Sequence, residues 1–99
     1  MKIVFMGTPE FSVPCLERLV SDGEEVVGVF TQPDKPKGRG YEMAFSPVKE
    51  CAIKHNILVF QPKSMKDGEA LKIMETLNPD LTIVVAYGKI LPKEILYFP

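Results

Sequence analysis

The sequence has almost no net charge and no long hydrophobic run, and each shortage excludes a class of protein. Its 12 Lys+Arg and 13 Asp+Glu leave a formal charge of −1, which excludes a generally polycationic nucleic-acid binder but leaves room for a local basic patch. No apolar run approaches the ~20 residues of a membrane span. The first apolar run covers only residues 3–6, so we expect neither a membrane span nor a signal peptide.

Cysteine and histidine are also scarce. Cys15 and Cys51 lie far apart, without a CxxC motif and without a histidine in a metal-ligand pattern, which predicts reduced thiols rather than a disulfide framework or a zinc site. The single histidine, His55, is expected near the end of a helix, where it can interact with the last carbonyls. Because no partner carboxylate or nucleophile is evident for it, we predict no metal site and no catalytic residue in this chain.

What the sequence does contain is typical of one globular domain of 99 residues, 45% of them apolar. Four short apolar runs occupy residues 3–6, 26–30, 57–60 and 81–86. The first, second and fourth are nearly continuous, as in strands buried on both faces of a parallel sheet. Helical segments are predicted between them and after the last. The alternation predicts an α/β fold, an open parallel sheet of about four strands with helices on both faces.

Each helical segment carries its own signal. Phe11, Cys15 and Leu19 share one face at a spacing of four residues. Ser46 followed by Pro47 is typical of an N-cap and a first helical residue. A third helix over residues 70–77 is stopped by the Asn-Pro pair at 78–79, and a short one is expected over residues 93–97.

The connection over residues 31–45 has no periodic apolar pattern, and loops of this length are usually functional or disordered. It leaves the carboxyl end of a strand, where open α/β sheets place their ligand sites. The basic residues Lys35, Lys37 and Arg39 give it a small positive excess, which suits a finger that contacts phosphates. A solvated surface loop would have the same composition.

The turns after the first and fourth strands are further candidates. The first contains only Gly7 of a GxGxxG motif, and Pro9 removes a backbone amide, so NAD or FAD binding is not expected. Phe11 would lie at the mouth of the cleft. The turn that begins at Tyr87-Gly88 could line the pocket of a flat aromatic ligand. Alternatively, its apolar residues simply cap the core.

Taken together, the segments MGTPEFSVPCLERL, TQPDKPKGRG, SPVK, FQPKS, NPDL and VVAYGKILPKEIL resemble the methionyl-tRNA formyltransferase family along the whole chain. The resemblance implies a Rossmann-like catalytic domain, a cytoplasmic location, and transfer of a formyl group from 10-formyltetrahydrofolate to the amine of methionyl initiator tRNA. Residues 1–99 would then be the N-terminal half of that catalytic domain, with the family's C-terminal tRNA-binding barrel domain absent.

The same resemblance implies roles for individual residues. The loop with Lys35, Lys37 and Arg39 would enter the tRNA acceptor end, although Tyr41-Glu42 replace residues that are often basic in the family. Phe11 would lie near the methionyl group. The folate-side pocket would be formed by a run of six residues at the end of the fourth strand: Ala86, Tyr87, Gly88, Lys89, Ile90 and Leu91.

The family's catalytic Asn-x-His motif and aspartate have no match in residues 1–99. Formyl transfer needs groups that stabilise a charged intermediate and move protons, so we expect this chain alone to be inactive. Two alternatives remain open: a stand-alone RNA-binding module, or a folate-dependent formyltransferase that acts on a small amine. The apolar fourth strand would form an open sheet edge, and we expect the isolated chain to self-associate through it.

Overall fold

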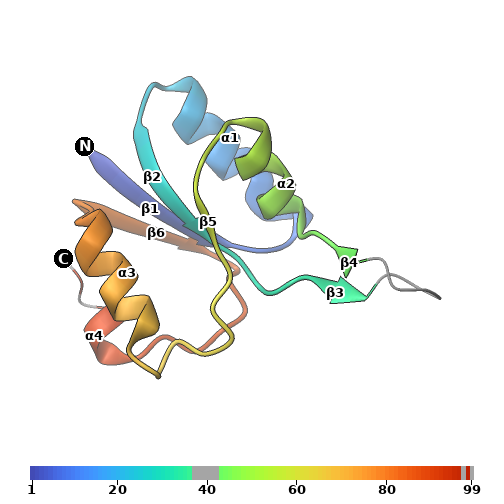
Figure 1. The fold of residues 1–99 in the computed structure, drawn as a ribbon. Coiled ribbons are helices and arrows are strands. Elements are labelled where there is room, and N and C mark those ends of the chain that lie inside the picture. Colours follow the sequence, from blue (N-terminus) through green and yellow to red (C-terminus); the bar gives the residue numbers. More distant parts are fainter. Residues whose placement is uncertain (37–42, 97, 99) are drawn as a thin grey trace.

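The computed structural model describes residues 1–36, 43–96 and 98, and is built on a four-stranded sheet. The strands are β1 (Lys2–Gly7), β2 (Glu25–Phe30), β5 (Val59–Phe60) and β6 (Leu81–Val85). They lie in the order β5-β2-β1-β6, and every neighbouring pair is parallel (Figure 1). This confirms the predicted open parallel sheet. The strand β6 ends one residue earlier than predicted because Ala86 has a φ of 53°, which an extended strand cannot contain.

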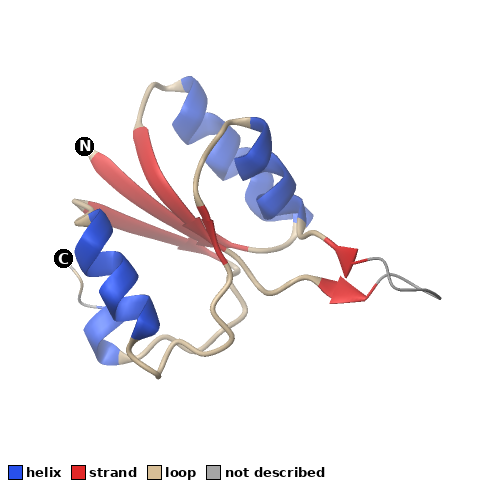
Figure 2. Cartoon of the chain, viewed as in Figure 1, coloured by secondary structure: helices blue, strands red, loops and turns tan. Residues whose placement is uncertain are grey.

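Helices cover both faces of the sheet, as predicted (Figure 2). The short helix η1 (Glu10–Ser12), α1 (Val13–Ser21) and α2 (Pro47–Lys54) lie on one face, and α3 (Glu69–Leu77) and α4 (Lys93–Leu96) lie on the other. The predicted boundaries have clear local causes. The Ser46 hydroxyl accepts from the Lys49 amide at 3.0 Å and so caps α2. Asn78 adopts a left-handed conformation, φ 47°, that ends α3.

The core has two halves because side chains of β1 alternate between the faces of the sheet. Phe5 packs with Leu16 of α1 and Val48 of α2. Val4 and Met6 point the other way and pack with Met74 of α3 in the second half of the core. All of these side chains are completely buried. The central strand therefore holds the two helical layers together.

The order of the strands places a crevice beside β1. The chain adds β2 and β5 on one side of β1 and then returns to add β6 on the other side, where Gly7 pairs with Val85. Ligands of open α/β sheets bind at the carboxyl ends of the strands where the order reverses in this way. As expected from the sequence, β6 is an outer strand, and Leu81 and Val84 on it are exposed.

The connection over residues 31–45 differs from the expectation of a segment without regular structure. It contains two short antiparallel strands, β3 (Lys35–Pro36) and β4 (Met43–Ala44), which extend beyond the edge of the main sheet (Figure 1). We call β3 and β4 the arm. Strands of two residues are too short to produce an alternating pattern, so the sequence could not reveal them. Within the described residues, no helix is long and apolar enough to cross a membrane.

Replacement of Gly7 tests the close contact between β1 and β6. A Cβ at this position would lie 2.8 Å from the backbone oxygen of Val85, whereas a Cβ at Gly28 would meet only side-chain ends of Phe60 and Leu77. Side chains adjust more easily than paired backbone, so Gly7→Ala should lower the free energy of unfolding by about 2–3 kcal/mol and Gly28→Ala by about 1 kcal/mol. Equilibrium urea unfolding at one protein concentration measures both losses; equal losses would contradict the expected difference.

Candidate functional site

The loops that leave β1, β2 and β6 are joined by hydrogen bonds at the carboxyl edge of the sheet. The Thr8 hydroxyl donates to the carbonyl of Tyr87 at 2.8 Å and accepts from the amide of Gln32 at 3.3 Å. The Ser12 hydroxyl donates to the carbonyl of Val85 at 2.7 Å. Two hydroxyl side chains thereby bond to backbone groups at and just beyond the strand ends. These hydrogen bonds hold the three loops in a defined arrangement at the edge.

The turn after β6 has a backbone conformation that depends on glycine. Gly88 has a φ of 89°, and a Cβ there would lie 2.4 Å from Nε2 of Gln32. That amide instead donates to the carbonyl of Gly88 at 2.9 Å. The close contact joins the turn after β6 to the loop after β2.

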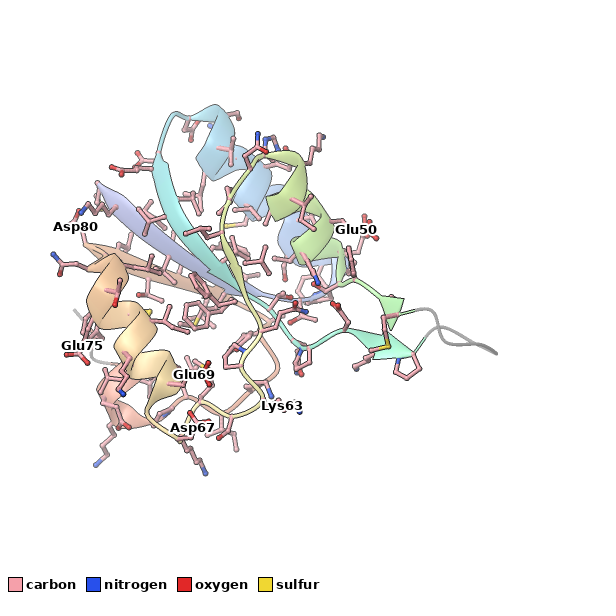
Figure 3. All side chains as sticks on the ribbon, in the orientation of Figure 1. Glu50, Lys63, Asp67, Glu69, Glu75 and Asp80 are labelled. Atoms are coloured by element: carbon pink, nitrogen blue, oxygen red, sulfur yellow. The ribbon has the colours of Figure 1, made fainter. Side chains whose placement is uncertain are left out.

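The structure divides the six predicted folate-side residues into outward and inward groups. Ala86, Gly88 and Ile90 are exposed, and Ile90 is the most open of them, at 80%. Tyr87 is buried with its hydroxyl donating to Met65 Sδ at 3.4 Å, and burial raises the pKa of Tyr87 to about 12. The remaining two also serve the fold: Leu91 packs against the core, and Lys89 Nζ donates to the carbonyl of Lys63 at 2.9 Å. Figure 3 labels Lys63 in the loop that precedes α3.

A pocket of about 190 Å³ lies between the turn after β1 and the base of the arm. Pockets for drug-sized ligands measure about 300–1,000 Å³, so this one suits a single side chain or small group. Phe11 lies outside it, on η1, with its side chain 70% exposed. The pocket is lined by residues from three segments of the chain: Thr8, Pro9, Gln32, Pro33, Lys35, Ala44, Phe45, Ser46 and Pro47.

A polar network at the base of the arm holds its two ends together. Lys49 Nζ lies 2.9 and 3.1 Å from the carboxylate oxygens of Asp34 and 3.8 Å from the centre of the Phe45 ring. Gln61 Nε2 donates to Asp34 at 2.7 Å and to the carbonyl of Gln32 at 3.1 Å. The hydrogen bonds from Lys49 and then Gln61 hold the pKa of the Asp34 carboxyl below its ordinary value of 3.8.

The hydroxyls of Thr31 and Ser46 form a second link across the base, 2.6 Å apart. Thr31 is buried, and Ser46 also caps α2. Two of the three basic residues predicted for this loop, Lys37 and Arg39, lie outside the described residues. The third, Lys35, begins β3 and is exposed at the rim of the pocket.

Sequence reasoning missed the residues that build the edge and the base of the arm. Thr8 directly follows one buried strand, and Gln32 and Asp34 lie within four residues of the end of the next, so all three could have been found as polar residues near strand ends. No local pattern links Lys49 to Asp34, and no partner of His55 was evident from the sequence. Glu17 supplies that partner, with Oε2 3.0 Å from His55 Nε2, and it comes from a different helix.

Loss of the Lys49 ammonium tests the anchoring of the arm. Lys49→Met should lower the free energy of unfolding by about 1–2 kcal/mol because Asp34 loses a charged hydrogen-bond donor in a mostly buried position. The matched control is Arg18→Gln, which removes the exposed pair with Asp22 and should cost less than about 0.5 kcal/mol. Urea unfolding at neutral pH measures both, and equal losses would contradict the anchoring role.

The stabilisation by Asp34 also depends on pH. Because its pKa is lowered in the folded protein, the contribution is complete above the ordinary pKa of the carboxyl and is lost as the pH falls through the folded value. The difference between wild type and Lys49→Met should therefore shrink in acid.

Comparison with known proteins places the whole chain in one family. The sequence model described as "Formyl transferase" matches residues 1–99. Proteins named "Methionyl-tRNA formyltransferase" align with the entire chain at 62% identity in Alkaliphilus oremlandii, 57% in Clostridioides difficile and 55% in Sulfurihydrogenibium sp.. The chain spans 32% of the length of each of these relatives. Since the family model is matched from the first residue to the last, the chain belongs to the formyl transferase family.

Proposed function

We propose that the intact protein transfers a formyl group from 10-formyltetrahydrofolate to the amino group of methionyl initiator tRNA. The observation that carries this proposal is the alignment of the entire chain with proteins named for that reaction, eight of which are 54–62% identical to it. A protein that formylates initiator tRNA would work in the cytoplasm, because the ribosome uses initiator tRNA there.

In this proposal the described residues bind and orient the substrates. The turn after β6 would contact the folate through the backbone of Ala86 and Gly88 and the exposed side chain of Ile90. The buried Tyr87 would position the turn from within rather than touch the ligand. Phe11 would contact the methionyl end, since its ring is exposed beside the edge. The sequence predicted all six residues of the turn for the folate side, and the exposed ones among them are proposed here as the ligand contacts.

The connection over residues 31–45 would contact the acceptor end of the tRNA through Lys35, Lys37 and Arg39, of which Lys35 lies in the arm and the other two lie outside the described residues. Its support is the network around Asp34 and Lys49, which fixes both ends of the arm to the body of the domain. A basic segment on a fixed base loses less conformational entropy on binding than a free loop would. The groups that move protons and stabilise the charged intermediate would come from the part of the catalytic domain that follows residue 99.

Removal of one basic side chain tests the tRNA contact. In the intact protein, Arg39→Ala should weaken binding of methionyl initiator tRNA and reduce the slope of log affinity against log salt by about 1, because one phosphate contact is lost. The control is Lys72→Ala, an exposed lysine on α3, on the opposite face of the sheet from α1 and α2. An unchanged slope for Arg39→Ala would refute the contact.

An assay of formyl transfer by the intact protein, run beside the binding assay, separates the alternatives. Salt-dependent tRNA binding without any formyl transfer in the intact protein would favour an RNA-binding module. Formyl transfer to a small amine, with methionyl-tRNA inactive as acceptor, would favour the small-amine reaction.

Gly88→Ala tests the folate side independently. The added methyl would displace the Gln32 amide and open the turn, so the KM for 10-formyltetrahydrofolate should rise about tenfold or more, because small misplacements of binding groups are costly. The KM for methionyl-tRNA should stay within about twofold, which steady-state formylation kinetics in the intact protein would measure. An equal rise in both values would contradict a folate-specific role for the turn.

A further inference from the structure

Three side chains with sulfur, nitrogen and oxygen donors meet where α1 packs on α2, away from the edge described above. Cys51 and His55 are four residues apart on α2 and therefore lie on the same side of that helix. Glu17 reaches them from α1, with Oε1 3.3 Å from Cys51 Sγ and Oε2 3.0 Å from His55 Nε2. One donor atom from each of the three residues lies within 4.8 Å of the others.

We propose that Glu17, Cys51 and His55 form a binding site for a zinc-like divalent transition-metal ion. Zinc binds thiolate sulfur at about 2.3 Å and imidazole nitrogen or carboxylate oxygen at about 2.0–2.2 Å. Donor atoms around a tetrahedral ion are consequently about 3.3–3.7 Å apart. The two hydrogen-bonded separations, 3.3 and 3.0 Å, lie at or just below the lower end of this range, and the donor atoms all lie within 4.8 Å of one another, so small rotations of the side chains would be enough to admit the ion. A set of sulfur, nitrogen and oxygen donors fits zinc. Sites for Ca²⁺ or Mg²⁺ are instead built from oxygen ligands.

The arrangement does not fit a nucleophilic cysteine. Glu17 receives hydrogen bonds from both the thiol and the imidazole, so the histidine is engaged with the carboxylate and not with the sulfur. Burial, followed by the hydrogen bond to Glu17, raises the pKa of the Cys51 thiol to about 11, which makes the free thiol unreactive. The same two donors hold the pKa of the Glu17 carboxyl below its ordinary value, so that it is ionised and available as a ligand.

The groove beside the cluster is open to solvent and mostly acidic, so a cation can enter there. The groove has a volume of about 380 Å³, and its charged lining residues are Glu10, Glu17, Glu50 and Lys54. Figure 3 labels Glu50 on α2. Lys54 Nζ lies 3.7 Å from Glu17 Oε1, and its side chain is 70% exposed, so an arriving metal ion can replace it at little cost. The fourth coordination position would face this groove and be filled by water.

Binding has a defined proton balance. The S–H bond of Cys51 breaks, a sulfur–metal bond forms, and the proton passes to the buffer. For His55 to bind through Nε2, the imidazole takes the tautomer with its proton on Nδ1, so one N–H bond is exchanged for the other through solvent, and neither His55 nor ionised Glu17 adds a net proton. The sequence argued against zinc because the two cysteines are far apart. In the structure the third ligand is not a cysteine but Glu17, 34 residues before Cys51.

Titration of the intact, metal-free protein with ZnCl₂ tests the proposal. Isothermal calorimetry in two buffers of different ionisation enthalpy should give one ion bound per chain and about one proton released. Replacement of zinc by Co²⁺ should produce the near-ultraviolet band of a cobalt–thiolate bond. Cys51→Ser and His55→Gln should each lower the zinc affinity at least about tenfold. The control is Cys15→Ser, which removes the second free cysteine of the chain, on α1 and outside the cluster. It should leave the zinc affinity unchanged.

Several results would overturn the site. The zinc titration would do so if no zinc bound, if binding survived both Cys51→Ser and His55→Gln, or if binding were lost in Cys15→Ser. The cobalt complex would do so if it lacked the thiolate band. In each case the cluster would be only a hydrogen-bonded link between α1 and α2. Because Cys51 is buried and its replacement can disturb folding, circular dichroism accompanies each variant. His55→Gln, at a partly exposed position, decides the matter if Cys51→Ser does not fold.

Discussion

The Thr8 hydroxyl holds the loops that leave β1, β2 and β6 within hydrogen-bonding distance of one another. It can do so because β1 is the central strand, buried on both faces, so that the residue following it lies between the two neighbouring strand ends. Gly7 makes the approach possible, since a side chain there would meet the backbone of Val85. Everything placed on the carboxyl edge, including the turn after β6 and the pocket beside the arm, is positioned relative to this junction.

Polar contacts hold the arm in place, whereas apolar contacts hold most of the rest of the domain together. Asp34 and Lys49 are both largely buried as side chains, and Gln61 completes the hydrogen bonding of the carboxylate. A partly buried pair of this kind adds little net stability over an apolar packing but strongly disfavours any arrangement that leaves one charge alone. The network therefore specifies where the arm begins and ends more than it stabilises the fold.

Much of the fold could be predicted from the sequence, because buried parallel strands and helix caps have local signals. The runs at residues 3–6 and 26–30 became β1 and β2, and Ser46-Pro47 began α2 as expected. The arm could not be predicted, since two strands of two residues have no periodicity. The inward orientation of Tyr87 was also hidden, because it depends on the left-handed conformation of Ala86 and on Met65, which is remote in sequence. The cluster of Glu17, Cys51 and His55 depends on how two helices pack, which no local pattern encodes.

Gln32 makes three hydrogen bonds, each to a different segment of the chain. Its amide N–H donates to Thr8, its side chain donates to the carbonyl of Gly88, and its own carbonyl accepts from Gln61 at the base of the arm. One residue thus bonds to both the turn on one side of the edge and the network on the other. Because the bonds to Thr8 and Gln61 use its backbone and only the bond to Gly88 uses its side chain, rotation of that side chain can release the turn after β6 and leave the other two bonds in place. A change in the turn can therefore be taken up by a single side-chain torsion and does not have to reach the base of the arm.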